Sequence, residues 1–198
     1  MSSSLASTPP NEGTRRVLSA RQARTVQGLT VAALEELRAV GYEQLTVRNV
    51  ARRSGVAPAT AYTYFASKEH LVTEVFWRKL NALPEPRIDR RRCPADRVTD
   101  ALADIMRLAA DEPALMSACT IAMMADDPDV RHLRDRIGLE LHRRFAAALG
   151  DGADGGVLRA LDLAMAGALV RAGTGHLPYA DVPGRMAEVA TLLLEKRS

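Results

Sequence analysis

The feature that most constrains this 198-residue chain is the spacing of three small residues in its first third. Ala51 is followed four residues later by Gly55 and ten residues later by Ala61. Two short helices that cross steeply need a small side chain at the crossing and a turn residue that adopts positive φ without steric cost. The spacing therefore predicts a helix-turn-helix, with short helices over 47–53 and 58–64.

The second of these helices is expected to lie in the major groove of DNA, since that is how such a unit reaches base edges. Its exposed side would carry hydroxyls and methyl groups that can contact bases, and tyrosines that can contact phosphates. Further phosphate contacts are expected where a cation and free backbone N–H groups meet at the start of a helix. The candidate DNA-binding residues are Thr46, Arg48, Pro58, Ala59, Thr60, Tyr62, Thr63, Tyr64 and Lys68. Packing in the protein interior is the alternative for Tyr62, and Phe65 is expected in the core.

The charge is distributed unevenly along the chain. Residues 1–80 contain 11 Lys and Arg against 6 Asp and Glu, whereas residues 81–198 contain 16 against 18. A basic first part is typical of a chain whose N-terminal portion meets an anion. Residues 1–18 are expected to form a disordered basic arm. Its Arg15 and Arg16, with the nearby Arg21 and Arg24, would either attract the DNA backbone or be simply solvated.

A series of short motifs surrounds the predicted turn. They are Gly41-Tyr42, Leu45-Thr46-Val47, Val50-Ala51, Ser54-Gly55-Val56, Tyr62-Thr63-Tyr64-Phe65-Ala66-Ser67-Lys68-Glu69 and Leu71. Over about residues 20–72 these motifs resemble the N-terminal DNA-binding domain of the TetR family of bacterial transcriptional repressors. The resemblance implies an all-α homodimer whose C-terminal helical domain binds a small ligand and releases DNA. It also implies groove contacts from Pro58, Ala59, Thr60, Tyr62 and Thr63, and phosphate contacts from Thr46, Tyr64 and Lys68.

Three residues depart from the usual pattern of that family. Ala57 stands where a serine often caps the recognition helix, Ala59 replaces a frequent glycine, and Ala61 replaces a larger apolar residue. The departures concern the N-cap of this helix and the operator sequence that it reads.

The rest of the chain also predicts helices, because alternating β-branched and aromatic runs are missing. We expect an all-α fold of about nine helices. The first covers about 20–40 and ends at Gly41, and the fourth begins after a capping Ser67 and reaches Leu80. The break at 83–86 would separate a DNA-binding domain, 19–80, from a ligand-binding and dimerisation domain, 87–198. The five helices of the second domain are expected at about 95–110, 113–124, 127–148, 157–173 and 182–196.

A methionine-rich stretch indicates an apolar ligand pocket in the second domain. Four of the seven methionines fall within nineteen residues, and methionine can line an adaptable pocket. The alternative is that these side chains simply form core. The candidate pocket residues are Ile105, Met106, Leu115, Met116, Cys119, Met123 and Met124. The implied ligand is small and largely apolar, such as a lipid, a steroid, an aromatic or a drug-like compound.

The expected helix over 157–173 is apolar on nearly every side, so other helices must cover it. With the last helix it could form a four-helix dimer interface, and an interior position in a monomer is the alternative. The candidate interface residues are Leu161, Ala164, Ala168, Val189 and Leu193.

The sequence gives little support for catalysis. His70, His132, His142 and His176 lack the spacing of a metal or catalytic site, and the acidic run at 126–129 fits the start of a helix. We therefore expect no catalytic residues, no metal and no cofactor. The longest apolar run, 163–170, is too short to cross a membrane. Two cysteines without a disulfide framework favour a cytoplasmic protein.

These patterns favour a transcriptional regulator over an enzyme. We expect a repressor that binds a double-stranded DNA operator as a homodimer and is released by a small, largely apolar ligand. The alternative is a helical small-molecule-binding or enzyme-like protein whose DNA-binding unit is vestigial.

Overall fold

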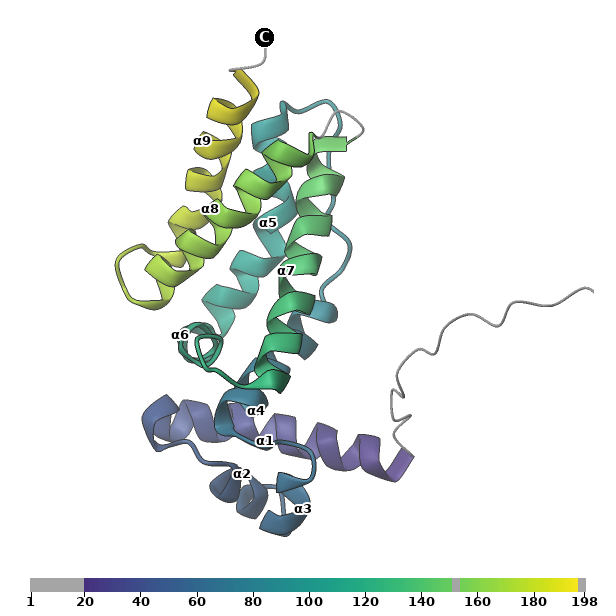
Figure 1. Cartoon of the computed structure of the whole chain (residues 1–198), viewed down its shortest axis with the longest axis vertical. Coiled ribbons are helices and arrows are strands. Elements are labelled where there is room, and N and C mark those ends of the chain that lie inside the picture. Colours follow the sequence, from purple (N-terminus) through teal and green to yellow (C-terminus); the bar gives the residue numbers. More distant parts are fainter. Residues whose placement is uncertain (1–19, 151–153, 196–198) are drawn as a thin grey trace, which may run out of the picture.

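The computed structural model describes residues 20–150 and 154–195. The predicted arm at 1–18, with Arg15 and Arg16, lies outside the described residues. Within them the chain forms nine α-helices, a 3₁₀ turn and no strand, which confirms the predicted all-α class (Figure 1). The elements are α1 (Ala20–Gln44), α2 (Val47–Arg53), α3 (Pro58–Tyr62), α4 (Lys68–Asn81), α5 (Pro94–Asp111), α6 (Pro113–Ala122), α7 (Pro128–Leu149), α8 (Gly155–Gly173), η2 (Tyr179–Asp181) and α9 (Val182–Glu195).

Local capping chemistry sets several of these boundaries. The side chain of Thr46 accepts a hydrogen bond from the Asn49 N–H at the start of α2. Ser67 caps α4 in the same way, as predicted, and Asp127 caps α7. Gly41 has a φ of 75° and interrupts the helical geometry of α1, at the position where the sequence predicted its end. Only glycine adopts such a backbone readily.

Two helices are shorter than predicted. The recognition helix α3 ends at Tyr62 rather than at residue 64. The Thr63 and Tyr64 N–H groups bond to carbonyls three residues back, a tightened turn that ends the helix. Similarly, α6 ends at Ala122 rather than at 124, and Met124 N–H bonds to the Ile121 carbonyl.

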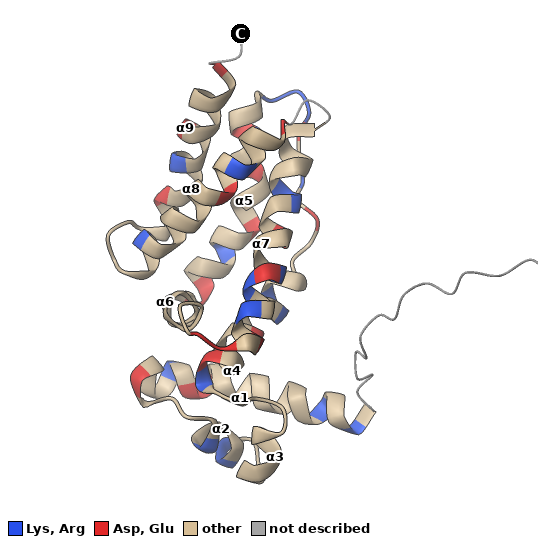
Figure 2. Cartoon of the chain, viewed as in Figure 1, with Lys and Arg blue, Asp and Glu red and all other residues tan. Residues whose placement is uncertain are grey.

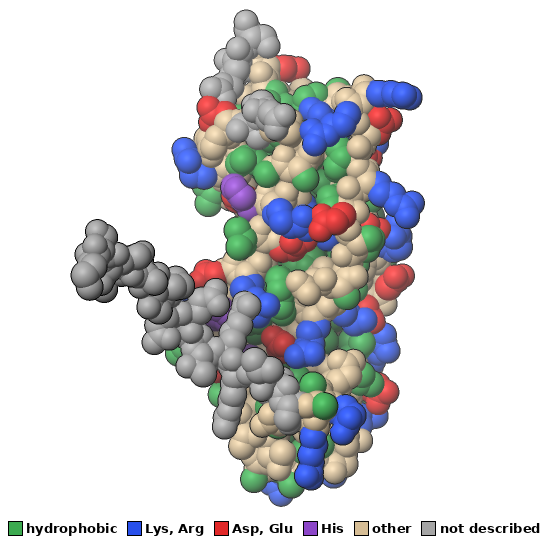
Figure 3. Space-filling model, turned by 90° about the vertical axis from the view of Figure 1, so that its right-hand side faces the viewer, with side chains coloured by type: hydrophobic (Ala, Val, Ile, Leu, Met, Phe, Trp, Pro, Cys, Tyr) green, Lys and Arg blue, Asp and Glu red, His purple; other side chains and the backbone are tan. Residues whose placement is uncertain are grey.

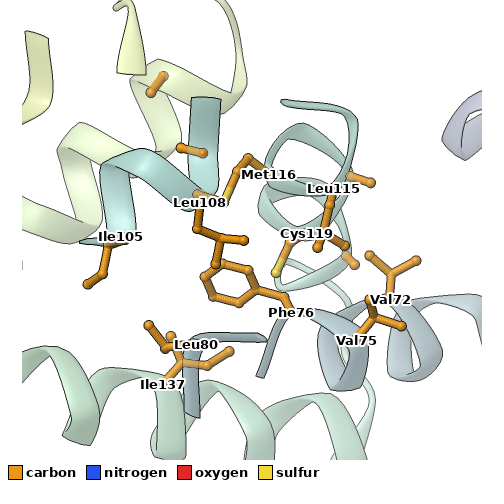
Figure 4. Packing of buried hydrophobic residues seen from close by; sticks show 14 of the residues in the cluster. Val72, Val75, Phe76, Leu80, Ile105, Leu108, Leu115, Met116, Cys119 and Ile137 are labelled. Atoms are coloured by element: carbon orange, nitrogen blue, oxygen red, sulfur yellow. The ribbon is translucent and has the colours of Figure 1, made fainter. Parts of the chain in front are cut away.

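The helices form two connected layers. Helices α1 to α3 make the lower end of the molecule, and α5 to α9 pack together above them (Figure 1). Helix α4 belongs to both parts, because it packs on α1 below and on α6 and α7 above. Its Phe76 lies among Leu108, Met116 and Cys119 in one continuous buried cluster (Figure 4).

A buried carboxylate also ties the two parts together. Glu112 precedes α6 and is 6% exposed. Its carboxylate pairs with Arg38 of α1 at 2.6 Å and with Lys79 of α4 at 3.0 Å. Burial alone would raise the pKa of Glu112, but the hydrogen bonds and charges of the two cations outweigh burial and hold it below its ordinary value.

Candidate nucleic-acid interface and ligand cavity

Helices α2 and α3 meet as the small-residue spacing predicted. Ala51 and Ala61 are fully buried, and Gly55 has a φ of 69° in the turn between the helices. The Val56 N–H donates to the Ala51 carbonyl at 2.9 Å, which closes the turn. Phe65 is 2% exposed and completes this small core. The predicted helix-turn-helix is confirmed.

The residues predicted to contact DNA lie mostly on the open surface of this unit. Tyr62 is 51% exposed, so its ring is available for contact rather than packed away. Tyr64 and Lys68 are half-buried. The remaining predicted residues are all exposed: Thr46, Arg48, Pro58, Ala59, Thr60 and Thr63.

Lys68 has an internal role that the sequence did not indicate. Its Nζ donates to the Tyr42 carbonyl at 3.1 Å and lies 4.3 Å from the centre of the Tyr42 ring. The Tyr42 hydroxyl in turn donates to Glu69 at 3.0 Å. These contacts fix the end of α1 against the start of α4. An ammonium group has three N–H donors, so a phosphate contact by Lys68 stays compatible with this arrangement.

Helix α2 carries the positive charge of the interface. It carries Arg48, Arg52 and Arg53, and its ribbon is partly blue in Figure 2. Blue side chains also lie at the lower end of the molecule in the space-filling view (Figure 3). Arg53 is paired with Glu36 at 2.6 Å, whereas the side chain of the exposed Arg52 donates to Asn49 and makes no ion pair within the described residues. Sequence reasoning missed Arg52, although its position one turn after Arg48 could have revealed it.

The recognition helix begins without a side-chain cap. Ala57 occupies its N-cap position and makes no side-chain hydrogen bond. This agrees with the departure noted in the sequence and leaves a five-residue helix that depends on Ala61 for its anchoring.

An apolar cavity of about 340 Å³ lies between α7 and α8, and Thr120 of α6 also lines it. The cavity is open to solvent, because several of its lining residues, Met124 and Val170 among them, are exposed. Met123 and Met124, two of the candidate pocket residues, are among its lining residues. Sequence reasoning missed most of the wall, although its residues recur at helical spacing on α7 and α8. The other lining residues are Thr120, Arg134, Ile137, Gly138, Leu141, Asp162, Met165, Ala166, Leu169 and Val170.

The other predicted pocket residues lie in the core instead. Leu115, Met116 and Cys119 lie on the side of α6 that packs against α4 near Phe76, whereas Ile105 and Met106 belong to α5 (Figure 4). Burial accordingly raises the pKa of the Cys119 thiol. Met106 is partly buried, and the other four are buried: Ile105, Leu115, Met116 and Cys119.

The predicted dimer residues are mostly covered by the chain's own helices. Leu161 is fully buried, so it is not available to a partner. Ala164, Ala168, Val189 and Leu193 are half-buried. The apolar side chains that α8 and α9 leave open are Leu163, Val170 and Leu192, at 76%, 39% and 63% exposure. The exposed stripe of α8 therefore lies one to two residues away from the predicted one.

The described part of the chain shows no further kind of site. In residues 20–150 and 154–195 no group of three or more His, Cys, Asp or Glu could hold a metal ion. Cys93 and Cys119 are free thiols. In the same ranges no helix is long and apolar enough to cross a membrane.

A helix-turn-helix head on a helical body that carries an apolar cavity is typical of DNA-binding transcriptional regulators. A profile described as bacterial regulatory proteins of the tetR family matches residues 29–75. An uncharacterised HTH-type transcriptional regulator of Mycobacterium tuberculosis is 44% identical over 183 residues, which cover 88% of this chain and 82% of that protein. This chain belongs to the TetR family.

Other relatives place the chain in the same group. The HTH-type transcriptional repressor KstR of Rhodococcus jostii is 33% identical over 153 residues, covering 74% of this chain and 64% of that protein. A crystal structure of a TetR transcriptional regulator from Rhodococcus has a TM-score of 0.71 at 22% identity, covering 89% of this chain and 99% of that one. Thermus thermophilus FadR, solved with lauroyl-CoA, has a TM-score of 0.61 at 17% identity, covering 86% and 93%. The fold of most of the chain is thus shared with known regulators.

Proposed function

We propose that this protein is a cytoplasmic repressor that binds operator DNA as a homodimer and leaves it when a small, largely apolar ligand fills the α7–α8 cavity. The observation that carries the proposal is the position of the cavity. Met123 and Met124 line it, and only a few residues later Asp127 bonds to Ser67, which follows the recognition helix. A ligand in the cavity therefore lies next to the path that leads to the DNA-binding head.

Release follows from differential binding. The cavity wall includes both methionines that follow α6, so its shape depends on where the α6–α7 turn lies. A ligand that fits one position of this turn better than another shifts the population toward it. The affinity for DNA then falls by the same coupling free energy, typically about 1–3 kcal/mol. Two relatives support this reading: KstR is named a repressor, and FadR was solved with a bound acyl-CoA.

The homodimer is supported by the open side of α8. Leu163 and Gly167 lie one turn apart on this side, and a side chain built on Gly167 would meet nothing within 4 Å. A partner helix could therefore approach closely. Two recognition helices would then reach successive major grooves, which is how helix-turn-helix dimers read an operator.

The direct test is a gel shift with DNA from the region upstream of the protein's own gene, against random DNA of equal length over a salt series. We expect specific binding that persists at moderate salt and weakens steeply as salt rises. Apolar compounds can then be screened for release. Equal affinity for both DNAs at every salt concentration, on that region and on a library of genomic fragments, would contradict the proposal. It would favour a ligand-binding protein with a vestigial DNA-binding unit.

A further inference from the structure

The α7–α8 cavity has polar groups of opposite charge at its two ends. Arg134 lines it near the start of α7 and donates to the Ala125 carbonyl at 3.1 Å. Asp162 of α8 also lines it and lies 2.8 Å from Nδ1 of His142, eight residues beyond Arg134 on α7. Eight residues of helix rise about 12 Å. Arg134 therefore lies about two turns of α7 away from the residue that pairs with Asp162, and the apolar Ile137 and Leu141 line the wall between them.

Arg134 is the cation of this cavity that no acidic side chain neutralises. Within the described residues the only hydrogen bond of its side chain is the one to the Ala125 carbonyl, and its Nε is buried without a partner. The neighbouring acidic side chains are engaged elsewhere: Asp126 pairs with Arg131 and Asp127 bonds to Ser67. A guanidinium beside an apolar wall favours an anionic group, because the low local dielectric strengthens their attraction.

At the Asp162 end of the cavity, the free group is a hydrogen-bond acceptor, so a ligand that carries a donor would fit there. One oxygen of Asp162 is occupied by His142, while Oδ1 is buried and has no partner in the described part of the chain. A buried acceptor of this kind is costly until a donor reaches it. A hydroxyl on the ligand supplies that donor without adding charge.

We infer that the cavity takes an elongated apolar acid, with its carboxylate at Arg134 and a hydroxyl at the far end against Asp162. The inference rests on the proposed function in treating this cavity as the effector site, and it names the effector's chemical class. The reversed orientation is disfavoured, because it would set the carboxylate against Asp162. The acid end lies beside the α6–α7 turn, so ligand charge acts directly on the segment that leads to Ser67.

The test is isothermal titration calorimetry on the full chain without DNA, using four ten-carbon probes. They are 10-hydroxydecanoic acid, decanoic acid, 1-decanol and decylamine. We expect the hydroxy acid to bind most tightly, decanoic acid next, and the alcohol and the amine at least about tenfold more weakly than the hydroxy acid. Equal affinity for acid and alcohol, or tighter binding of the amine, would overturn the inference without any variant.

Variants then locate the two ends. Arg134→Gln should weaken both acids about tenfold or more and leave the alcohol unchanged. Arg131→Gln is the matched control, because it removes the same charge from the same helix at a residue that does not line the cavity. Asp162→Ala should remove the preference for the hydroxy acid over decanoic acid. If Arg131→Gln weakened binding of the acids as much as Arg134→Gln, the acids would be attracted by the overall positive charge of the helix. The assignment of Arg134 as the carboxylate-binding residue would then fail.

The outcomes separate this inference from the proposed function. Binding of the hydroxy acid with no effect on a specific gel shift would support the ligand class and contradict release by ligand. A specific gel shift, together with failure of all four probes to bind, would leave the regulator standing and overturn the ligand class.

Discussion

The Ser67 hydroxyl donates a hydrogen bond to Asp127 Oδ2 at 2.7 Å, and each of these residues caps a different helix. Ser67 accepts from the His70 N–H at the start of α4, directly after the recognition unit. Asp127 accepts from the N–H groups of Asp129 and Val130 at the start of α7. The two helix starts are thereby joined through their caps. The Ser67 hydroxyl is the main reason that the pKa of Asp127 lies below its ordinary value.

This joint should behave as a coupled pair in stability measurements. Ser67→Ala and Asp127→Ala should each cost about 1–2 kcal/mol, since each loses a cap and the shared hydrogen bond. The double variant should cost about 1 kcal/mol less than their sum. Thr46→Ala is the control, because the Thr46 side chain caps α2 and, within the described residues, bonds to Asn49 of the same helix and to no other helix. Urea unfolding measures all of these, and strict additivity of Ser67 and Asp127 would contradict the coupling.

The Glu112 pairing should make stability depend on pH. The folded pKa of Glu112 lies below its ordinary value of 4.5, so its stabilisation is present above that pH and is lost as the pH falls through the folded pKa. Glu112→Gln should cost about 1–3 kcal/mol at pH 7 and much less near pH 3. The measurement is urea unfolding at both values of pH. Glu188→Gln is the control, because Glu188 forms an exposed pair with Arg185, and it should have little effect on stability at either pH. If Glu112→Gln cost the same stability at both values of pH, the ionised Glu112 pairing would not be the source of the stabilisation.

The uncapped recognition helix offers a stabilising substitution. Ala57 has an extended backbone at the N-cap, where a serine side chain could accept from the N–H groups of the first turn. Ala57→Ser should therefore raise the free energy of unfolding by about 0.5–1 kcal/mol. Ala66→Ser adds the same hydroxyl at an exposed turn position close by and should change little. Equal effects of the two variants in thermal unfolding would show that capping is not the cause.

Contacts to phosphates and to bases should differ in their salt and sequence dependence. Arg48→Ala should weaken binding to all DNAs and lower the slope of log affinity against log salt by about 0.9. Thr60→Ala should leave that slope unchanged and alter the preference among operator variants. Arg185→Ala, at an exposed cation on α9, serves as the control. Gel shifts over a salt series distinguish these patterns, and an unchanged slope for Arg48→Ala would remove it from the interface.

The exposed stripe of α8 should hold the dimer together. Leu163→Glu is expected to give a monomer, because a charge at a packed apolar contact is strongly unfavourable. Leu139→Glu is the control, since Leu139 is about as exposed, at 68% against 76%, but lies on α7. Light scattering after gel filtration reports the mass of each. A dimer that survives Leu163→Glu but not Leu139→Glu would move the interface to α7.

What the sequence could predict followed from short-range rules. Ser67, Gly41 and Gly55 each act within one turn of their own position, so their caps and positive φ values were predictable. The pocket was predicted only in part, because Met116 and Met123 have the same local pattern. Which of them faces a cavity depends on Phe76, some forty residues earlier in the chain (Figure 4). The Ser67 and Asp127 side chains are bonded across sixty residues of sequence, and no rule of local spacing predicts such a contact.

The packing of Phe76 limits how readily the DNA-binding head of this protein can be replaced by that of another regulator. Its ring belongs to the segment that carries the DNA-binding head, yet it fills the interior of the upper helices beside Leu108 and Cys119 (Figure 4). A chimera that took its first eighty residues from another regulator would bring in a foreign side chain at this point. Such a graft would leave a void or a clash unless the facing residues were changed with it, so new operator specificity is reached more readily by altering the exposed surface of α3.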